Sequence, residues 1–267
     1  MTHHGPDGAV DTGLIGTELL VVALLAGAVA YVLAARRSSW APGRVARWLA
    51  GTAVAVAGLV GLAVVDGHDP GIHVAGHLLV GMVAPLLLAT AAPVTLALRT
   101  LPHGRARVLG RLLRSRPVAV VGHPAVAALL DTGGMWLYFR TDVLAAVPPT
   151  LVHIHMLLAG YLFAFSLVGT DPAPHRPGLG TRAAVLVVAV AAHDVLAKLV
   201  YAAPGDRAEA AGVLLYYGGA PVHVVLLVLL GREWAAGQRR TRHRDARRRQ
   251  LTVTALRPAV EGAPGDL

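Results

Sequence analysis

The stretch HDPGIHVAGHLLVGMVAPLLLATAAP, residues 68–93, decides the fold of this chain. It places three histidines within ten residues, and a long apolar run follows them. A bilayer core of about 30 Å takes roughly 20 apolar residues of helix, so the run predicts a membrane-spanning helix. Asp69 and Pro70 are typical of a helix start, which puts His73 and His77 inside the helix. Imidazole is unfavourable in hydrocarbon, so these two side chains need a functional explanation.

The rest of the chain also has the composition of a membrane protein. Of its 267 residues, 55% are hydrophobic and only 15% are charged, which is unusual for a soluble domain of this length. The apolar runs long enough to span a bilayer are residues 14–35, 45–65, 71–98, 118–138, 147–169, 182–202 and 211–231. We therefore expect an all-α polytopic membrane protein with seven transmembrane helices over residues 14–231. Pro85 and Pro93 should kink the third helix or free its backbone carbonyls.

Arginines are distributed unequally between the predicted loops, and this predicts the orientation of the chain. When the loops are numbered alternately, one set carries only Arg140 and Arg207. The other set, with the C-terminal segment, carries Arg36, Arg37, Arg44, Arg47, Arg99, Arg105, Arg107, Arg111, Arg114, Arg116, Arg176, Arg182 and the arginines from 232 to 257. By the positive-inside rule the N-terminus is outside and the C-terminus is cytoplasmic. The net charge of +9 therefore reflects topology and does not indicate nucleic-acid binding.

Two segments flank the predicted membrane domain. Residues 1–13 are expected to form a short extracytoplasmic N-terminus. Residues 232–267 form a basic cytoplasmic tail, which we expect to be disordered and to contact anionic lipid. The first apolar run has no basic residue before it and is followed by Arg36 and Arg37, so we interpret it as a retained span rather than a signal peptide.

Histidine and aspartate side chains on four predicted helices fall at similar depths. At about 1.5 Å per helical residue, His73 lies roughly 5 Å and His77 roughly 11 Å below the outer surface. Their spacing of four residues puts them on one helix face. Counted in the same way, Asp131, His155 and His193 lie at roughly 11–14 Å on three other helices. Ionisable groups inside a membrane usually face the bundle interior, so we expect these side chains to meet.

Imidazoles gathered at one depth favour a copper or zinc site in the outer leaflet. The chain has no cysteine, so the ligands have to be histidine, methionine or carboxylate. The expected metal ligands are His73, His77, His155 and His193, with Asp131 or Met135 assisting. In the alternative interpretation, each histidine is an interhelical hydrogen-bond partner.

Other ionisable side chains near this depth have different expected roles. His153 is two residues from His155 and points to a different helix face, so only one of the two should join the site, and we favour His155. Asp194 and Lys198 are four residues apart and are expected to form an ion pair. The sequence contains no His-Glu-x-x-His, phosphate-loop or Gly-x-Ser-x-Gly motif, so nothing in it supports an enzyme.

Five different sequence blocks follow one another along the chain in a recognisable order. They are HVAGHLLVGMVAPLLLATAAPVTLALRTLP (73–102), HPAVAALL (123–130), HIHMLLAGYLFAFSLVGTDPAPHRP (153–177), HDVLAKLVYA (193–202) and YYGGAPV (216–222). In these blocks the sequence resembles the CtaG-like family of cytochrome c oxidase assembly factors, which are bacterial seven-span membrane proteins. The resemblance covers roughly residues 66–235.

The resemblance implies a role in maturing a haem-copper cytochrome c oxidase, by supplying copper to its subunits. The family histidines correspond to His73, His77, His155 and His193. We therefore expect a non-enzymatic protein of the bacterial cytoplasmic membrane that binds and delivers copper. Two alternatives remain open: a membrane cytochrome whose histidines ligate haem b, and a histidine-lined metal or ion transporter.

Overall fold

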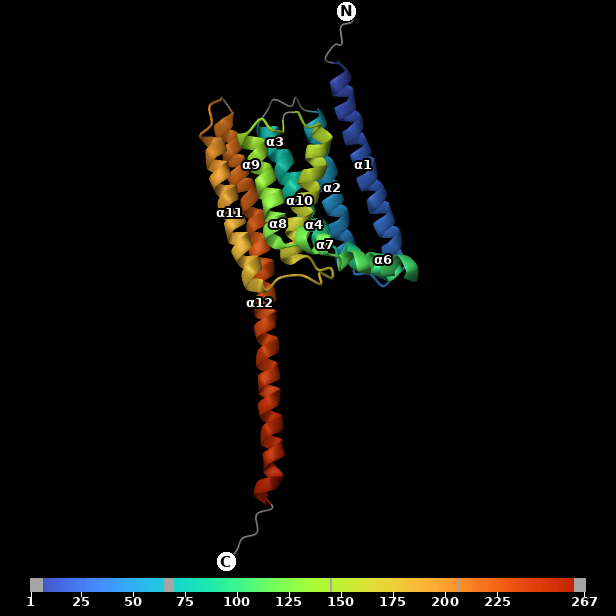
Figure 1. The fold of residues 1–267 in the computed structure, drawn as a ribbon, viewed down its shortest axis with the longest axis vertical. Helices are drawn as coiled ribbons and strands as arrows, with labels where there is room; N and C mark the ends of the chain where they lie inside the picture. Colours follow the sequence, from blue (N-terminus) through green and yellow to red (C-terminus); the bar gives the residue numbers. More distant parts are fainter. Residues whose placement is uncertain (1–6, 65–69, 145, 206, 262–267) are drawn as a thin grey trace, which may run out of the picture. The chain divides into compact units, whose positions relative to one another are not determined.

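The computed structural model describes residues 7–64, 70–144, 146–205 and 207–261, and their regular secondary structure is helical throughout (Figure 1). The elements are α1 (Asp7–Arg36), α2 (Pro42–Val64), α3 (Pro70–Gly76), η1 (His77–Val83), α4 (Ala84–Thr90), α5 (Pro93–Thr100), α6 (His103–Leu113), α7 (Arg116–Val121), α8 (Pro124–Ala128), η2 (Leu129–Gly133), α9 (Gly134–Arg140), α10 (Pro149–Val168), α11 (Leu179–Tyr201) and α12 (Ala208–Glu261). The two η elements are π-helices, in which the backbone hydrogen bonds run from residue i+5 to residue i.

Six helices among the described residues are long and apolar enough to cross a membrane. They are Ile15–Arg36, Pro42–Ala63, Gly71–Thr90, Pro149–Val168, Leu179–Tyr201 and Ala208–Arg239. The chain is thus an all-helical protein built for multiple membrane passes, as the composition predicts.

The fourth predicted run, residues 118–138, is divided among shorter helices. α7 ends at Val121, and α8, η2 and α9 then follow one another without a break from Pro124 to Arg140. The break falls before Pro124 because a proline disfavours helical backbone in the residue that precedes it. His123 is accordingly extended, and its Nδ1 accepts a hydrogen bond of 3.3 Å from the backbone N–H of Ala125, which caps α8.

The third predicted run, residues 71–98, ends earlier than the sequence predicts. α4 stops at Thr90, Ala92 adopts a left-handed conformation with φ 59°, and α5 begins at Pro93. Proline has no backbone N–H and suits the first turn of a new helix, so the chain turns at this point. The break expected from Pro93 is confirmed, and the predicted helix to residue 98 is wrong.

The helix formed by α3, η1 and α4 changes its hydrogen-bond register in the middle. An α-helix would require the N–H of residue 85 to bond to the Gly81 carbonyl, but Pro85 has no N–H. The N–H of Ala84 instead bonds to the Leu79 carbonyl, one residue further back than in an α-helix. Pro85 therefore leaves the Gly81 carbonyl without its α-helical donor. This explains why a π-helix occupies the middle of the span.

α10 packs against the freed carbonyl of Gly81 at Gly160. A Cβ added to Gly160 would collide with the Gly81 oxygen and would lie 2.9 Å from Cγ of Pro85. Only glycine therefore allows the two helices to approach this closely. The Cα–H of Gly160 faces the carbonyl oxygen, an arrangement that recurs at close helix contacts.

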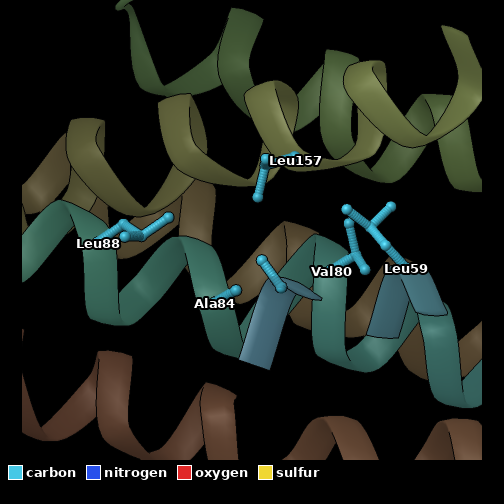
Figure 2. Close-up of a cluster of buried hydrophobic side chains, with 6 residues drawn as sticks. Leu59, Val80, Ala84, Leu88 and Leu157 are labelled. Carbon is cyan, nitrogen blue, oxygen red and sulfur yellow. The ribbon is translucent and has the colours of Figure 1, made fainter. Parts of the chain in front are cut away.

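α2, α4, η1 and α10 enclose the centre of the bundle. Its buried side chains are Ala55, Leu59, Val80, Ala84, Leu88 and Leu157 (Figure 2). Gly58 on α2 permits the contact with η1, because a Cβ there would lie 2.7 Å from Val80. Lipid tails are as apolar as these side chains, so close packing at small residues supplies much of the attraction between the helices.

The loop after α10 is fixed at the end of the bundle where α4 turns into α5. The buried carboxylate of Asp171 accepts hydrogen bonds from the backbone N–H of Val94 (3.0 Å) and Thr95 (2.6 Å) and from the Thr95 hydroxyl (2.6 Å). Buried Arg182 donates from Nη1 to the Leu167 carbonyl at 2.7 Å, at the C-terminus of α10. An acidic group at one helix start and a basic group at another helix end both match the helix dipoles.

The chain divides into two compact units, residues 1–227 and residues 228–267, and the boundary between them falls within α12. α12 continues to Glu261, through part of the segment that the sequence predicts to be disordered from Arg232. Arginine, alanine, glutamine and leucine dominate residues 239–256 and are good helix formers, which accounts for the continued helix. Residues 1–6 of the predicted N-terminal segment and 262–267 of the tail lie outside the described residues.

Replacing Gly160 by alanine tests the close approach of α10 to η1. The added methyl group has to push α10 away from the Gly81 carbonyl, which should destabilise the protein by about 1–3 kcal/mol. Thermal unfolding of the purified protein in detergent measures this as a lower melting temperature. Gly27→Ala is the matched control, because nothing lies within 4 Å of a Cβ there. Equal melting temperatures for the two variants would contradict the proposed contact.

Candidate metal centre

Two cavities inside the bundle collect the histidines that the sequence singles out. The wide cavity has a volume of about 640 Å³ and a mostly apolar lining. Its polar and sulfur-containing lining residues include His73, His77, Asp131, Met135, His153 and His155. The narrow cavity has a volume of about 20 Å³, and its polar and sulfur-containing lining residues include His77, Met82, Asp131, Met135, His193 and His223.

His73 and His77 lie one helical turn apart, on α3 and at the first residue of η1, and both line the wide cavity as their spacing predicts. The ring of His73 stacks on Tyr138 of α9 with 5.7 Å between centroids. The ring of His77 is buried and meets Phe139 edge-on at 6.4 Å. Aromatic side chains of α9 therefore hold both imidazoles in place.

His155 reaches the wide cavity from α10 and contacts the backbone of η2. Its Nε2 lies 3.1 Å from the Leu130 carbonyl oxygen. A carbonyl only accepts hydrogen bonds, so this contact places the proton on Nε2 and leaves Nδ1 as the nitrogen with a lone pair that a metal could use. Gly134 makes room for the ring, since a Cβ there would lie 2.6 Å from Nε2. His153 lines the same cavity, and its buried Nδ1 has no hydrogen-bond partner among the described residues.

Asp131 and Met135 line both cavities and therefore stand between them. Asp131 lies within η2, and Met135 follows one turn later on α9. Both π-helices thus carry a candidate ligand, His77 in η1 and Asp131 in η2. Short π-helical segments are frequent at functional sites, because the extra residue turns a side chain toward the site.

His193 and His223 meet in the narrow cavity. Their ring centroids are 4.8 Å apart and the rings are nearly perpendicular, at 88°. His193 is only 3% exposed, and neither of its ring nitrogens has a hydrogen-bond partner among the described residues. With Asp194 they form a group whose possible ligand atoms all lie within 4.8 Å of one another. This is the densest set of metal-ligand atoms in the described part of the chain.

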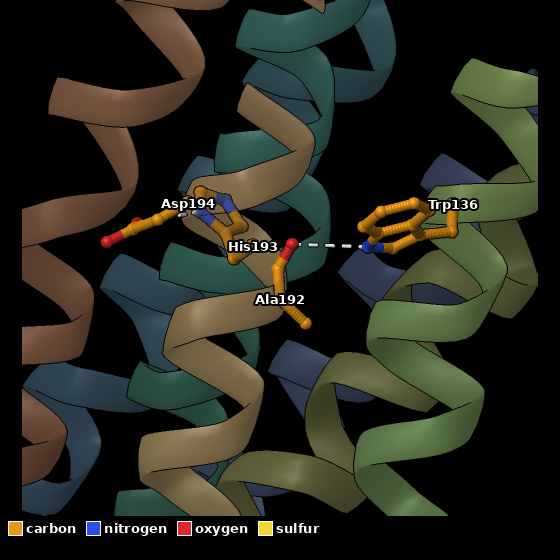
Figure 3. A network of polar contacts seen from close by, with 4 residues as sticks. All are labelled: Trp136, Ala192, His193 and Asp194. Atoms are coloured by element: carbon orange, nitrogen blue, oxygen red, sulfur yellow. Dashed lines mark hydrogen bonds and ion pairs between the residues drawn. The ribbon is translucent and has the colours of Figure 1, made fainter. Parts of the chain in front are cut away.

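Figure 3 shows how α11 presents His193 between two neighbours. On one side Nε1 of Trp136 donates a 3.2 Å hydrogen bond to the Ala192 carbonyl, which ties α9 to α11. On the other side the Asp194 carboxylate lies 3.7 Å from Nδ1 of His193. That distance is too long for a hydrogen bond, but it is short enough for the carboxylate to favour a proton on Nδ1.

The expected ion pair between Asp194 and Lys198 is not formed. Asp194 approaches His193 instead, and Nζ of Lys198 lies 5.9 Å from the ring centroid of Tyr216. Lys198 is close to the end of α11 and its side chain is exposed. A long lysine side chain near the end of a membrane helix extends toward the interface, which draws its ammonium group away from Asp194.

His223 and Met82 also line the narrow cavity, although at about 1.5 Å per helical residue both lie nearer the midplane than the predicted ligands. α11 and α12 run antiparallel, since Gly219 lies against His193 and Gly212 against Tyr201. Side chains lean toward the N-terminus of their own helix, so on antiparallel neighbours they lean toward each other. The rings of His193 and His223 therefore meet although their Cα atoms lie about one turn apart in depth. A correction for side-chain direction would have found this pair from the sequence.

The four predicted ligands are consequently divided between two cavities. His73, His77 and His155 line the wide cavity, while His193 lines the narrow one. His77 lines both and connects the two groups. The arrangement offers imidazole nitrogens, thioether sulfurs and the carboxylates of Asp131 and Asp194 to a metal ion, and no thiolate.

These features define a helical membrane protein in which histidine, methionine and aspartate side chains gather around cavities between the helices. The model of the cytochrome c oxidase caa3 assembly factor family, CtaG, matches residues 27–237. The chain belongs to this family.

Curated relatives come from mycobacteria. An uncharacterized protein of Mycobacterium bovis is 32% identical over 176 residues, which cover 61% of this chain and 27% of the relative. An uncharacterized protein of Mycobacterium leprae is 31% identical over 182 residues, with the same coverage. The match thus spans only about a quarter of the length of these relatives. No solved structure matches the chain.

Replacing His193 by leucine tests whether this histidine is a structural hydrogen-bond partner. Its nitrogens are buried without hydrogen bonds, so the metal-free variant should be as stable as the wild type or more stable by about 1–3 kcal/mol. Thermal unfolding in detergent with a metal chelator measures this. Asp171→Ala, which removes the acceptor of three hydrogen bonds, should lower the melting temperature in the same assay. A comparable loss for His193→Leu would contradict a ligand role and favour a structural one.

Proposed function

We propose that this chain is a non-enzymatic assembly factor of the bacterial cytoplasmic membrane that binds copper and delivers it to a subunit of a haem-copper cytochrome c oxidase. Family membership supports the role in oxidase assembly. The proposed ligands are His73, His77, His155 and His193, with Asp131 and Met135 assisting. Copper is the cargo in this proposal and leaves with the oxidase.

The observation that carries the proposal is the pair of cavities joined at His77, Asp131 and Met135. A protein that only packs against oxidase subunits has no need of several imidazoles that line cavities between its helices. Imidazole and thioether together suit Cu(I), whereas zinc and magnesium rarely take thioether ligands. Without thiolates the ion is held less tightly than by a cysteine site, which favours transfer to another protein.

The same proposal includes seven membrane spans, with α8, η2 and α9 as the fourth. Leu129 and Leu137 on this helix are 72% and 46% exposed, as lipid-facing side chains would be. With the N-terminus outside, the arginine-rich loops lie in the cytoplasm, and the loop from α9 to α10 lies outside. The wide cavity then lies in the outer leaflet, on the side from which copper arrives.

Single cysteines test this orientation, because the natural chain contains none. Ser39 is exposed between α1 and α2, and Asp142 is exposed between α9 and α10. A membrane-impermeant thiol reagent added to intact cells should label Asp142→Cys and leave Ser39→Cys unlabelled until the membrane is permeabilised. Labelling of Ser39→Cys alone would show that the orientation is opposite to the proposed one. Equal protection of both cysteines would show that α8, η2 and α9 do not cross the membrane.

Copper binding is tested on the purified protein. We expect about one Cu(I) per chain, and His77→Ala and His193→Ala should each abolish stoichiometric binding. Metal analysis after desalting gives the stoichiometry. His103→Ala is the control, because His103 is exposed at the start of α6, away from both cavities. Copper retained by both cavity variants would refute the proposal, and a haem absorption band in the purified protein would favour the cytochrome alternative.

A further inference from the structure

We propose that the narrow cavity is the seat of the copper cargo, with His193 and His223 as its paired imidazole ligands, and that the wide cavity is its entrance. This inference rests on the proposed function, because it takes copper to be the cargo. It differs from the sequence-based ligand set in two ways. It adds His223, and it assigns His73 and His155 to the route rather than to the seat.

The burial of His193 is the first argument. A neutral imidazole carries one N–H donor and one lone pair, and both are strongly unfavourable when buried without partners. Neither nitrogen of His193 has a hydrogen-bond partner among the described residues, although the residue is only 3% exposed. A metal ion bound to one of these nitrogens removes the larger part of this deficit. Because Asp194 favours the proton on Nδ1, Nε2 is the nitrogen left for the ion.

The geometry of the two rings is the second argument. Imidazole nitrogen binds such metals at about 2.0 Å, so two nitrogens that share one ion lie no more than about 4 Å apart. One ring nitrogen of His193 and one of His223 lie within 4.8 Å of each other, so small side-chain rotations bring both to a shared ion. The sulfur-bearing side chains of Met82 and Met135 line the same cavity and supply soft donors.

The size of the two cavities is the third argument. A volume of about 20 Å³ admits one particle the size of a water molecule, which matches a single dehydrated ion. The wide cavity, at about 640 Å³, is far too large to grip one ion, but it can admit copper with its accompanying ligands. His77, Asp131 and Met135 line both cavities, so an ion that moves from one to the other passes these side chains.

Gly219 is the positioning residue of this seat. A Cβ at Gly219 would lie 2.5 Å from Cε1 and 3.0 Å from Nε2 of His193. The absence of a side chain on α12 at this point therefore gives the His193 ring its place beside His223. Gly219→Ala displaces the ring without removing any ligand atom.

The test is a Cu(I) titration of the full chain in detergent, without oxygen, against a competing chelator. His223→Ala should weaken binding more than about tenfold, as His193→Ala does, and Gly219→Ala should weaken it to a smaller extent. His223→Met, which keeps a soft donor, should restore part of the affinity. His73→Ala and His155→Ala should retain the bound copper at equilibrium and load it more slowly, and His103→Ala should match the wild type.

The outcomes separate this inference from the proposed function. If the wild type binds no copper, the proposed function fails. If the wild type binds copper and His223→Ala binds it equally well, the narrow cavity is not the seat, and the proposed function stands.

Melting temperatures of the metal-free variants show whether each is folded. X-ray absorption of the copper-loaded wild type should show imidazole nitrogen together with sulfur. Loss of the sulfur signal in Met82→Leu or Met135→Leu identifies the thioether, and a spectrum of nitrogen and oxygen alone would contradict the thioether contribution.

Discussion

The structure depends on one missing hydrogen-bond donor, the backbone N–H that Pro85 lacks. Without it the Gly81 carbonyl has no α-helical partner, and the helix adopts π register from His77 to Val83. Gly160 brings α10 against that carbonyl. η1 and α10 enter from the same end of the bundle, so residues shortly before this contact lie at one level on both helices (Figure 1). His77 precedes Gly81 by four residues and His155 precedes Gly160 by five, which is why both line the wide cavity.

The sequence predicts the helices well and their interruptions less well. The apolar runs indicate the spans, and Pro93 indicates where one of them ends. Unpaired backbone N–H and C=O groups are unfavourable in lipid, so helices continue through apolar runs and are interrupted at prolines. The two π-helices are harder to predict. η1 follows from Pro85, but η2 has no proline to explain it, and only the adjacent glycines Gly133 and Gly134 mark its end. Gly134 is needed for a different reason, to admit the ring of His155, and this becomes visible only once the two helices are placed side by side.

The candidate site is also predicted only in part, because the depth of each residue along its helix does not give the direction of its side chain. Depth along each helix groups His73, His77, Asp131, His155 and His193, but only the first four of these line the wide cavity, while His193 lines the narrow one. It separates His193 from His223, because it counts Cα atoms and ignores the direction in which each side chain leans. The resulting error in depth is about one helical turn. Sequence reasoning about membrane sites therefore needs the direction of each helix as well as the depth of each residue.

Buried polar groups have different surroundings in two parts of the bundle. At the end where α5 begins, Asp171 accepts three hydrogen bonds and Arg182 donates to the C-terminus of α10, so the charges there stabilise the fold. In the narrow cavity the nitrogens of His193 have no hydrogen bonds, which opposes folding. Small-residue packing at Gly58 and Gly160 holds the helices together without help from the histidines. The contacts that stabilise the fold thus lie apart from the proposed metal site, so under the proposed function a cargo ion would enter and leave while the helices keep their places.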